Sequence, residues 1–446
     1  MEQSVSIAPL VSFRIAFGLV MLFSTLRYMS MGWVDTQLID PILHFSYFGF
    51  DWVKPLPGIG MYLVFSAMAI ACTAIILGWY YRFFAALFFL CFSYVELIDI
   101  TYYLNHYYFV SIISFMMILV PANRYFSLDA RRNPALERKT VGRWCILIFK
   151  LQIAIVYCYA GLAKINTDWL LEALPLAIWL PAKSSVPIIG AIFKYKFTAY
   201  LFSWIGMLFD TFIIAGLLFK KTRWLAYIAV VIFHSLTGIL FQIGVFPIVM
   251  IFAVTIFFSD SFHGRIIDGL TRFFKRKRDV TIATNDLPSK TSKSKLLFPF
   301  LMIFFMFQLL FPWRYTLYPG SLFWTEEGYR FSWRVMLMEK AGTATFYVKD
   351  GAEGREGSVV NHEFLNSHQE KQMAMQPDLI LQYAHLLEDH YQQQGMKDPK
   401  VRAEVWVTIN ARPAQLLIDP EVDLTAKTDR WAHKDWILPF NENELR

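Results

Sequence analysis

The sequence predicts a mainly α-helical membrane protein: a polytopic bundle of about nine transmembrane helices, followed by an extramembrane C-terminal domain with strands and one or more helices. Composition is the first reason, because 56% of the 446 residues are hydrophobic and only 17% are charged. The second is that apolar runs of about 20 residues, the length that crosses the hydrocarbon layer, recur as far as residue 312. We therefore expect a membrane domain at 1–312 and a C-terminal domain at 313–446.

The apolar runs and the short polar connections between them set the expected spans. They lie at 8–28, 59–78, 80–98, 105–121, 143–163, 197–219, 223–241, 244–259 and 296–312. No basic segment precedes the first run, so we interpret it as a retained span and not as a cleaved signal peptide. All four cysteines fall within apolar runs, which argues against a disulfide framework.

The distribution of Lys and Arg predicts the orientation, because cytoplasmic connections are enriched in these residues. Three connections are strongly basic: 122–143, 220–223 and 260–295. Nine spans and a cytoplasmic N-terminus place all three inside and the C-terminal domain outside the cytoplasm. Lys183, Lys194 and Lys196, in an outer loop, depart mildly from this rule. Because the basic residues lie mostly in such connections, the net charge of +7 predicts no nucleic-acid partner.

The C-terminal domain is expected to be mostly β. Its segments "TATFYVKD" and "AEVWVTIN" alternate as strands do, and "PDLILQYAHLLEDHYQQQG" has the pattern of an amphipathic helix that ends at Gly395. Its polar stretch contains four histidines, for which exposure to solvent is the simplest interpretation: His362, His368, His385 and His390. The chain has no HExxH, CxxC, Walker or GxSxG motif, so we expect no metal site.

Polar and charged side chains at membrane depth are costly, and each is therefore a candidate for function. The main candidates are Arg14, Glu96, Asn105, His106, Gln152, Lys164, Asp210, His234 and Gln242. Arg14 and Glu96 lie near span ends, where a long side chain can reach the bilayer surface. In the expected topology, the spans that carry His106, Lys164 and His234 bring these groups to one level, in the outer half of the membrane.

Lys164, in "YCYAGLAKINTDW", has two interpretations. It could be an interfacial anchor, or a buried amine kept for chemistry. Small neighbours permit close helix packing, and Asp168 would lie one turn further on if the helix continued. His106 could be a ring at the headgroup boundary, His234 could bond to a neighbouring helix, and Asp210 is expected to face another helix or a cavity water.

Five segments resemble vitamin K-dependent gamma-carboxylases, and they occur in the same order. They are "LNHYYFVSIISFMMILVPANRYFSLDA", "LQIAIVYCYAGLAKINTDWL", "FHSLTGILFQIGVFPIVM", "FWTEEGYRFSWRVM" and "VWVTINARPAQLLIDPEVDL". The resemblance runs from near residue 100 to near residue 430 and so covers both expected domains. The broader grouping is the horizontally transferred transmembrane domain family.

The resemblance implies a two-part reaction. Vitamin K hydroquinone is deprotonated and oxidised by dioxygen to an epoxide, and a strongly basic oxygenated intermediate removes a γ-proton from a glutamate side chain, to which carbon dioxide then adds. By this resemblance Lys164 would be the base and His106 would act with it. The implied quinone-binding residues are Asn105, Tyr157, Gly161 and His234, and the implied substrate-binding residues are Trp324, Ser332 and Trp333.

The resemblance also implies partners and a location. The cofactor would be vitamin K hydroquinone, as phylloquinol or menaquinol, with dioxygen and carbon dioxide as co-substrates and no metal. The partners would be the lipid bilayer, a glutamate-containing protein or peptide, and a quinone reductase that supplies the reduced vitamin. The chain would be a multi-pass protein of a bacterial inner membrane, or of the endoplasmic reticulum in a eukaryote.

Departures from the animal enzymes keep other functions open. Ala163 stands where they have a second lysine, Met338 stands where they have a histidine, and their cysteine pair has no counterpart. These differences affect recognition of a protein substrate more than quinone chemistry. The alternatives are a quinol epoxidase without carboxylase activity, and a non-catalytic membrane protein that binds quinone or lipid or transports a solute.

Overall fold

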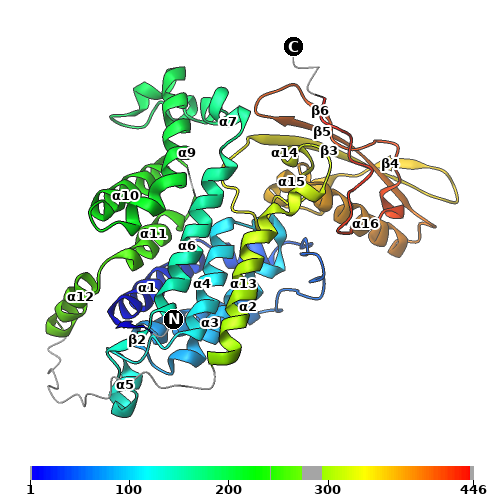
Figure 1. The fold of residues 1–446 in the computed structure, drawn as a ribbon. Coiled ribbons are helices and arrows are strands. Elements are labelled where there is room, and N and C mark those ends of the chain that lie inside the picture. The colour runs from blue at the N-terminus through cyan, green and yellow to red at the C-terminus, as the bar shows by residue number, and fades with distance from the viewer. Residues whose placement is uncertain (1–2, 242, 274–293, 442–446) are drawn as a thin grey trace.

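The structure, a computed structural model, describes residues 3–241, 243–273 and 294–441. It is mainly helical, and a helical bundle is followed by a C-terminal region of strands and helices (Figure 1). The long bundle helices are α1 (Ala8–Ser30), α2 (Gly60–Leu77), α3 (Tyr81–Ile98), α4 (Asn105–Leu119), α6 (Trp144–Ala163), α9 (Lys196–Leu218), α10 (Arg223–Leu240) and α13 (Ser294–Leu310). The fold class predicted from the sequence is confirmed.

Seven helical segments within the described residues are long and apolar enough to cross a membrane. They are Ala8–Ser30, Gly60–Leu77, Tyr81–Ile98, Trp144–Ala163, Lys196–Leu218, Arg223–Leu240 and Leu296–Leu317. Two of the nine expected spans differ. The span expected at 105–121 is the 15-residue helix α4, which is shorter than a typical span.

The span expected at 244–259 covers only the first arm of a bent pair of helices. Helix α11 (Phe246–Ala253) continues as a 3₁₀ turn to Phe257, and α12 (Asp260–Phe273) follows at an angle of 115°. The cause is local, because Phe258 has an extended backbone that ends the first helix. This pair counts as one further span only if both arms are taken together.

Arg14 is fully buried and does not reach toward the bilayer surface, contrary to the interpretation from sequence. Its guanidinium donates hydrogen bonds to the carbonyl oxygens of Ala122 and Phe126, at 2.9 and 2.7 Å. Gly78, which ends α2 with a φ of +64°, makes room for it: a Cβ there would lie 2.5 Å from an Arg14 nitrogen. Arg14 therefore joins α1 to the turns that follow α2 and α4.

Helices α9, α10 and α11 form a group that contacts α6 through α9 (Figure 1). The approach of α6 and α9 depends on Gly161, because a Cβ at this position would lie 2.5 Å from the hydroxyl oxygen of Thr211 and 2.7 Å from its backbone nitrogen. The remaining short elements are β1 (Ser4–Ser6), which pairs with β2 (Thr140–Gly142), and α5 (Leu128–Arg132), α7 (Thr167–Leu171), α8 (Leu176–Trp179) and α14 (Leu322–Thr325).

The C-terminal region is a four-stranded antiparallel sheet covered by helices. The strand order is β4 (Glu356–Ser358), β3 (Lys340–Lys349), β5 (Lys400–Ile409) and β6 (Gln415–Leu416). Two helices pack on it: α15 (Ser367–Met373), which begins with a capping box, and α16 (Pro377–Gln393). Both expected strands and the expected helix are present, but helix and strand are about equally represented, so "mostly β" understates the helical layer.

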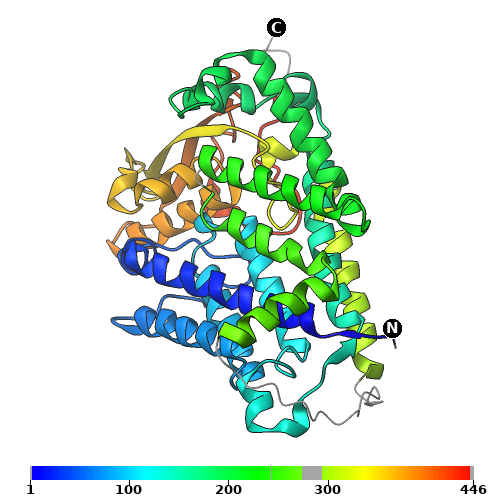
Figure 2. The same ribbon diagram turned by 90° about the vertical axis from the view of Figure 1, so that its left-hand side faces the viewer.

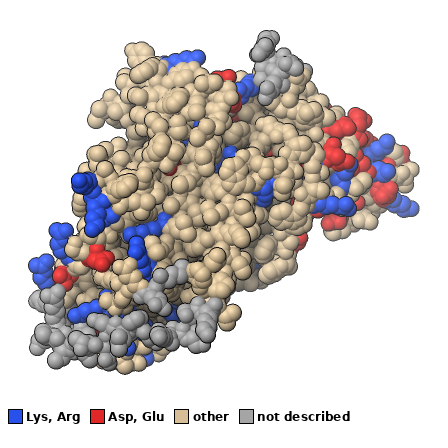
Figure 3. All heavy atoms as spheres, in the orientation of Figure 1, with Lys and Arg blue, Asp and Glu red and all other residues tan. Residues whose placement is uncertain are grey.

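The C-terminal region and the α7–α9 connection lie at one end of the molecule, and α5 lies at the other (Figure 1 and Figure 2). Lys and Arg side chains gather near the α5 and α12 end, whereas acidic side chains and Lys and Arg lie together over the C-terminal region (Figure 3). Part of the connection at 260–295, together with Gln242, falls outside the described residues.

Candidate functional site

A cavity of about 110 Å³ lies among α6, α9, α10 and α11. Most of its lining is apolar and aromatic: Val156, Ala160, Trp169, Leu176, Phe202, Gly206, Phe233, Phe241, Ile243, Phe246, Met250, Val335 and Met336. The polar side chains of Tyr157, Lys164, Asp210, His234 and Thr237 complete it. A mostly apolar cavity with a few convergent polar groups is typical of a small-molecule site. Within residues 3–241, 243–273 and 294–441, no group of three or more His, Cys, Asp or Glu is placed to hold a metal ion.

Lys164 is an ion-pair partner inside the protein and is not extended toward the bilayer surface. Its Nζ donates hydrogen bonds to Asp210 Oδ2 at 2.8 Å and to the carbonyl oxygen of Ala160 at 3.2 Å. Lys164 and Asp210 are only 6% and 5% exposed. Their attraction is therefore little screened by water, and both charged ends face the cavity.

Asp168, which would lie one turn beyond Lys164 only in a continuous helix, is not the partner of Lys164. Helix α6 ends at Ala163, and the side chain of Asn166 accepts a hydrogen bond from the Trp169 backbone nitrogen and starts the separate helix α7. That position requires an unbroken helix, and this cap breaks it. The true partner, Asp210, could be singled out in the sequence only as an acid within an apolar run.

A second polar pair faces the same cavity. A hydrogen bond of 2.8 Å joins the Tyr157 hydroxyl to His234 Nε2, and both side chains are buried. The other ring nitrogen of His234, Nδ1, has no hydrogen-bond partner among the described residues. The rings of Phe233 and Phe246 lie against the His234 ring, at centroid distances of 5.3 and 5.7 Å.

Three residues expected at the quinone site lie outside the lining. Gly161 is at the contact between α6 and α9, and its role in the structure is to let α9 approach. His106 contacts Phe246 from outside the cavity, with ring centroids 5.4 Å apart, and its Nε2 has no partner in the described part of the chain. Asn105 donates a hydrogen bond to the carbonyl oxygen of Arg334 at 2.7 Å.

Trp324, Ser332 and Trp333 also lie outside the lining. Trp324 is buried in the core of the C-terminal region and donates a hydrogen bond to the Leu438 carbonyl oxygen at 2.7 Å. Ser332 donates to the Tyr329 carbonyl oxygen, and the Trp333 ring stacks on that of Tyr108 at 4.9 Å.

The segment that comes directly after these residues does reach the cavity. Val335 and Met336 line it. Arg334, which lies between Trp333 and Val335, accepts the hydrogen bond from Asn105 at its carbonyl oxygen. The sequence thus pointed to the right segment, but it did not identify these two side chains, whose direction depends on a backbone with left-handed φ at Trp333 and Met336.

Two family models match the chain. The HTTM domain matches residues 2–262, which is more than half of the chain, and the lumenal domain of vitamin K-dependent gamma-carboxylase matches residues 293–443. The chain belongs to the vitamin K-dependent gamma-carboxylase family. No solved structure matches it.

Both family domains contribute to the cavity. Lys164, Asp210, Tyr157 and His234 come from the HTTM part, and Val335 and Met336 come from the lumenal part. The description of the second domain as lumenal fits an extracytoplasmic position for the C-terminal region. This family member is therefore a carboxylase-like membrane protein with one cavity shared by its two parts.

Proposed function

We propose that this protein is a vitamin K hydroquinone-dependent γ-glutamyl carboxylase, and that the hydroquinone binds in the cavity between α6 and α10. In the overall reaction, hydroquinone, dioxygen, carbon dioxide and a glutamate side chain give the epoxide, γ-carboxyglutamate and water. The observation that carries the proposal is that the Lys164–Asp210 pair and the Tyr157–His234 pair line the same, mostly apolar cavity.

The cavity residues fit a quinone ring. A volume of about 110 Å³ corresponds to roughly eight water-sized spheres, enough for a ring-sized ligand. Aromatic side chains supply flat apolar walls, among them Phe202, Phe233, Phe241 and Phe246. The Nδ1 of His234 offers a hydrogen bond to an oxygen on the ring. When bound, the hydroquinone would supply the electrons that reduce dioxygen.

Lys164 is the proposed base for the hydroquinone hydroxyl. The amine acts in its neutral form, after the ammonium of the ion pair has released a proton to water. It then takes the hydroquinone proton at Nζ, and the carboxylate of Asp210, 2.8 Å away, stabilises the ammonium that forms again. The apolar walls limit the access of water, which strengthens this interaction and protects reactive species from quenching. Asp210 thus adds a residue to the set that the sequence identified.

Tyr157 and His234 are proposed to orient the ring opposite Lys164, because their hydrogen bond fixes both side chains. His106 and Asn105 support this arrangement through Phe246 and Arg334. The glutamate side chain is proposed to approach along Val335 and Met336, where the lumenal part meets the cavity. Trp324, Ser332 and Trp333, which lie outside the lining, would then support the segment that carries Val335 and Met336.

Epoxidation without carboxylation is the second candidate. It is favoured by the position of Trp324, Ser332 and Trp333, which leaves only two apolar side chains of that segment in the cavity. The two functions share the chemistry of Lys164 and differ in whether a glutamate is carboxylated. A quinone reductase would supply the hydroquinone in either case.

The test uses purified protein in lipid, with reduced vitamin K, dioxygen, labelled bicarbonate and a short glutamate-containing peptide. Epoxide and fixed label together support the carboxylase, with the label expected in the peptide. Epoxide without label, also with several unrelated peptides, favours the epoxidase. Neither product, from protein that is folded and takes up the quinol, contradicts both and supports a non-catalytic binder or transporter.

A further inference from the structure

The loop that follows Lys164 is tied to the C-terminal region by a charged contact. Arg412 donates two hydrogen bonds to the Asp168 carboxylate, at 2.8 and 2.6 Å, and Asn410 donates a third at 2.6 Å. Arg412 also reaches Glu172, at 3.3 Å. Two parallel bonds between a guanidinium and a carboxylate fix the relative orientation of the groups as well as their distance.

Both sides of this contact are held firmly. Asn410 accepts a hydrogen bond from the Glu339 backbone nitrogen and donates one from its own backbone nitrogen to the Glu339 carbonyl oxygen, at 2.9 and 2.7 Å. The Glu339 carboxylate in turn accepts a hydrogen bond from the indole of Trp179, at the end of α8. The C-terminal region therefore contacts helices α7 and α8 at two points, Asp168 and Trp179.

Another side of α7 borders the cavity. Trp169, next to Asp168 in the chain, is buried, lines the cavity and donates a hydrogen bond from its indole to the Ser203 carbonyl oxygen at 2.8 Å. The Lys164 Nζ lies 5.3 Å from the centre of a Trp169 ring. Because α7 has only five residues, a shift of Asp168 moves Trp169 with it.

We propose that Arg412 is a positioning residue, which acts through Asp168 and Trp169 to hold the Lys164 amine against Asp210 in the cavity. The C-terminal region would then set the geometry of a site that lies in the membrane bundle. The role assigned to Lys164 in turnover rests on the proposed function, whereas its placement by Arg412 does not.

The charge state of Asp168 suits this role. Burial raises the pKa of Asp168, but the hydrogen bonds and charge of Arg412, with the bond from Asn410, outweigh burial and hold that pKa below its ordinary value. A carboxyl with a depressed pKa stabilises the folded state above its unfolded pKa, and this stabilisation is lost as the pH falls through the folded pKa. The contact is therefore intact at neutral pH.

The test compares Arg412→Ala, Arg412→Lys and the exchanged pair Asp168→Arg with Arg412→Asp. The matched control is Arg402→Ala, which removes another arginine–carboxylate pair of the C-terminal region, with Glu356, away from the α7–α8 contact. Two quantities are measured on protein in lipid: the rate at which an apolar amine reagent modifies Lys164, followed by mass spectrometry, and the kcat and KM of epoxide formation.

We expect Arg412→Ala to change the Lys164 modification rate and to lower kcat by about tenfold or more, because small misplacements of a reacting group are costly. Both quantities for Arg412→Lys should lie between those of the wild type and of Arg412→Ala. The exchanged pair should recover part of the kcat that Arg412→Ala loses, and Arg402→Ala should match the wild type. Equal modification rates in folded Arg412→Ala and Arg402→Ala would overturn the inference. If Arg412→Ala does not fold, the milder Arg412→Lys decides by the same comparison.

Different results would contradict the proposed function and the positioning role of Arg412. Wild-type protein that makes no epoxide contradicts the proposed function, while the modification rate of Lys164 still decides the placement. Conversely, normal epoxide formation with unchanged Lys164 reactivity in the Arg412 variants contradicts only the placement.

Discussion

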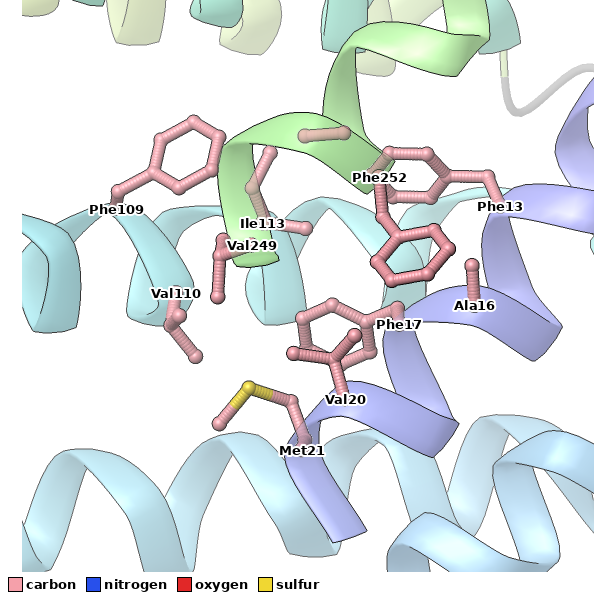
Figure 4. Close-up of a pocket in the computed structure, with 11 residues that line it drawn as sticks. Phe13, Ala16, Phe17, Val20, Met21, Phe109, Val110, Ile113, Val249 and Phe252 are labelled. Carbon is pink, nitrogen blue, oxygen red and sulfur yellow. The ribbon is translucent and has the colours of Figure 1, made fainter. Parts of the chain in front are cut away.

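Two cavities in the described part of the bundle have linings that differ in kind. The smaller, of about 20 Å³, lies between α1, α4 and α11 and is lined only by apolar side chains, which Figure 4 shows converging from the three helices: Phe13, Ala16, Phe17, Val20, Met21, Phe109, Val110, Ile113, Val249, Phe252 and Ala253. The larger has similar apolar walls but adds an ion pair and a tyrosine–histidine pair. Helix α11 contributes side chains to the linings of both cavities, from different faces.

The difference shows what distinguishes a site from a packing defect in a membrane bundle. Apolar hollows are inexpensive where every neighbour is already apolar, and the smaller one holds only one or two water-sized spheres, by the same rough measure. A buried lysine and aspartate are costly in such surroundings and persist where they are paired and used. The polar groups of the larger cavity, more than its volume, therefore support its assignment as the site.

Replacing Lys164 should have the largest effect. Lys164→Ala removes the proposed base, and Lys164→Arg keeps a cation beside Asp210 but cannot accept a proton at neutral pH. Both variants should lose epoxide formation by about 10³-fold, within the range for an essential base. Epoxide is measured by chromatography, and monodispersity in detergent checks folding. A Lys164→Arg protein with more than a tenth of normal turnover would show that only the charge is needed.

Asp210→Asn should have the next largest effect. The amide preserves volume and can still accept the hydrogen bond from Lys164, but it removes the charge that stabilises the ammonium. We expect epoxide formation to fall by about 100-fold, comparable to the loss of one preorganised electrostatic partner. Asp168→Asn is the informative comparison, since it alters the carboxylate that is nearer to Lys164 in the sequence. If it is the more harmful of the two, the observed pairing is not the functional one.

The site could be predicted from the sequence in part, and the reasons are physical. Lys164 and His234 stand out as polar residues inside apolar runs, and the resemblance selects both and adds Tyr157. The pairing of Lys164 with Asp210 joins residues 46 positions apart, and it depends on how α6 and α9 approach, which no local pattern encodes. The nearer Asp168 would lie one turn beyond Lys164 only in a continuous helix, and the cap at Asn166 breaks that helix.

The fold was predictable to a similar degree. Run length located the seven long spans, because crossing the hydrocarbon layer requires a minimum number of apolar residues. The segment at 244–259 is just as apolar, yet the extended backbone of Phe258 divides α11 and its 3₁₀ turn from α12. The snorkelling expected of Arg14 was wrong because three backbone carbonyls, brought together by turns distant in sequence, accept its hydrogen bonds inside the protein.

Filling the larger cavity tests whether its space is used. Gly206 lines it, and an added Cβ would meet only a Trp169 ring carbon at 3.6 Å, an ordinary contact. Gly206→Ala should therefore be tolerated, whereas Gly206→Leu should occupy the space proposed for the ring and raise the KM for quinol by about tenfold or more, the cost of one overpacked side chain. Initial rates over a range of quinol concentrations measure this. An unchanged KM in folded Gly206→Leu protein would indicate that the quinol binds elsewhere.

Tyr157→Phe should have a modest effect, because it removes one hydrogen bond and keeps the ring. A net value of about 1 kcal/mol corresponds to about a fivefold loss of turnover. His234→Gln retains a donor and an acceptor and should be milder than His234→Phe, which retains neither. The order of these rates tests the orienting role. Equal rates for His234→Gln and His234→Phe would indicate that His234 contributes packing and no hydrogen bond.

The smallest effect is expected in the apolar cavity, and it is the sharpest check on the comparison between the two. Val110→Ile adds one methylene to a hollow that is lined only by apolar groups. Burying it gains about 0.8 kcal/mol if it fits, and mild overpacking offsets that gain if it does not. Thermal unfolding in detergent should shift little, and kcat and KM for quinol should stay within about twofold of the wild type, since no polar group is touched. A large rise in KM with normal unfolding would mean that this hollow also receives part of the quinol, such as its apolar tail, and that polar groups alone do not mark where the ligand lies.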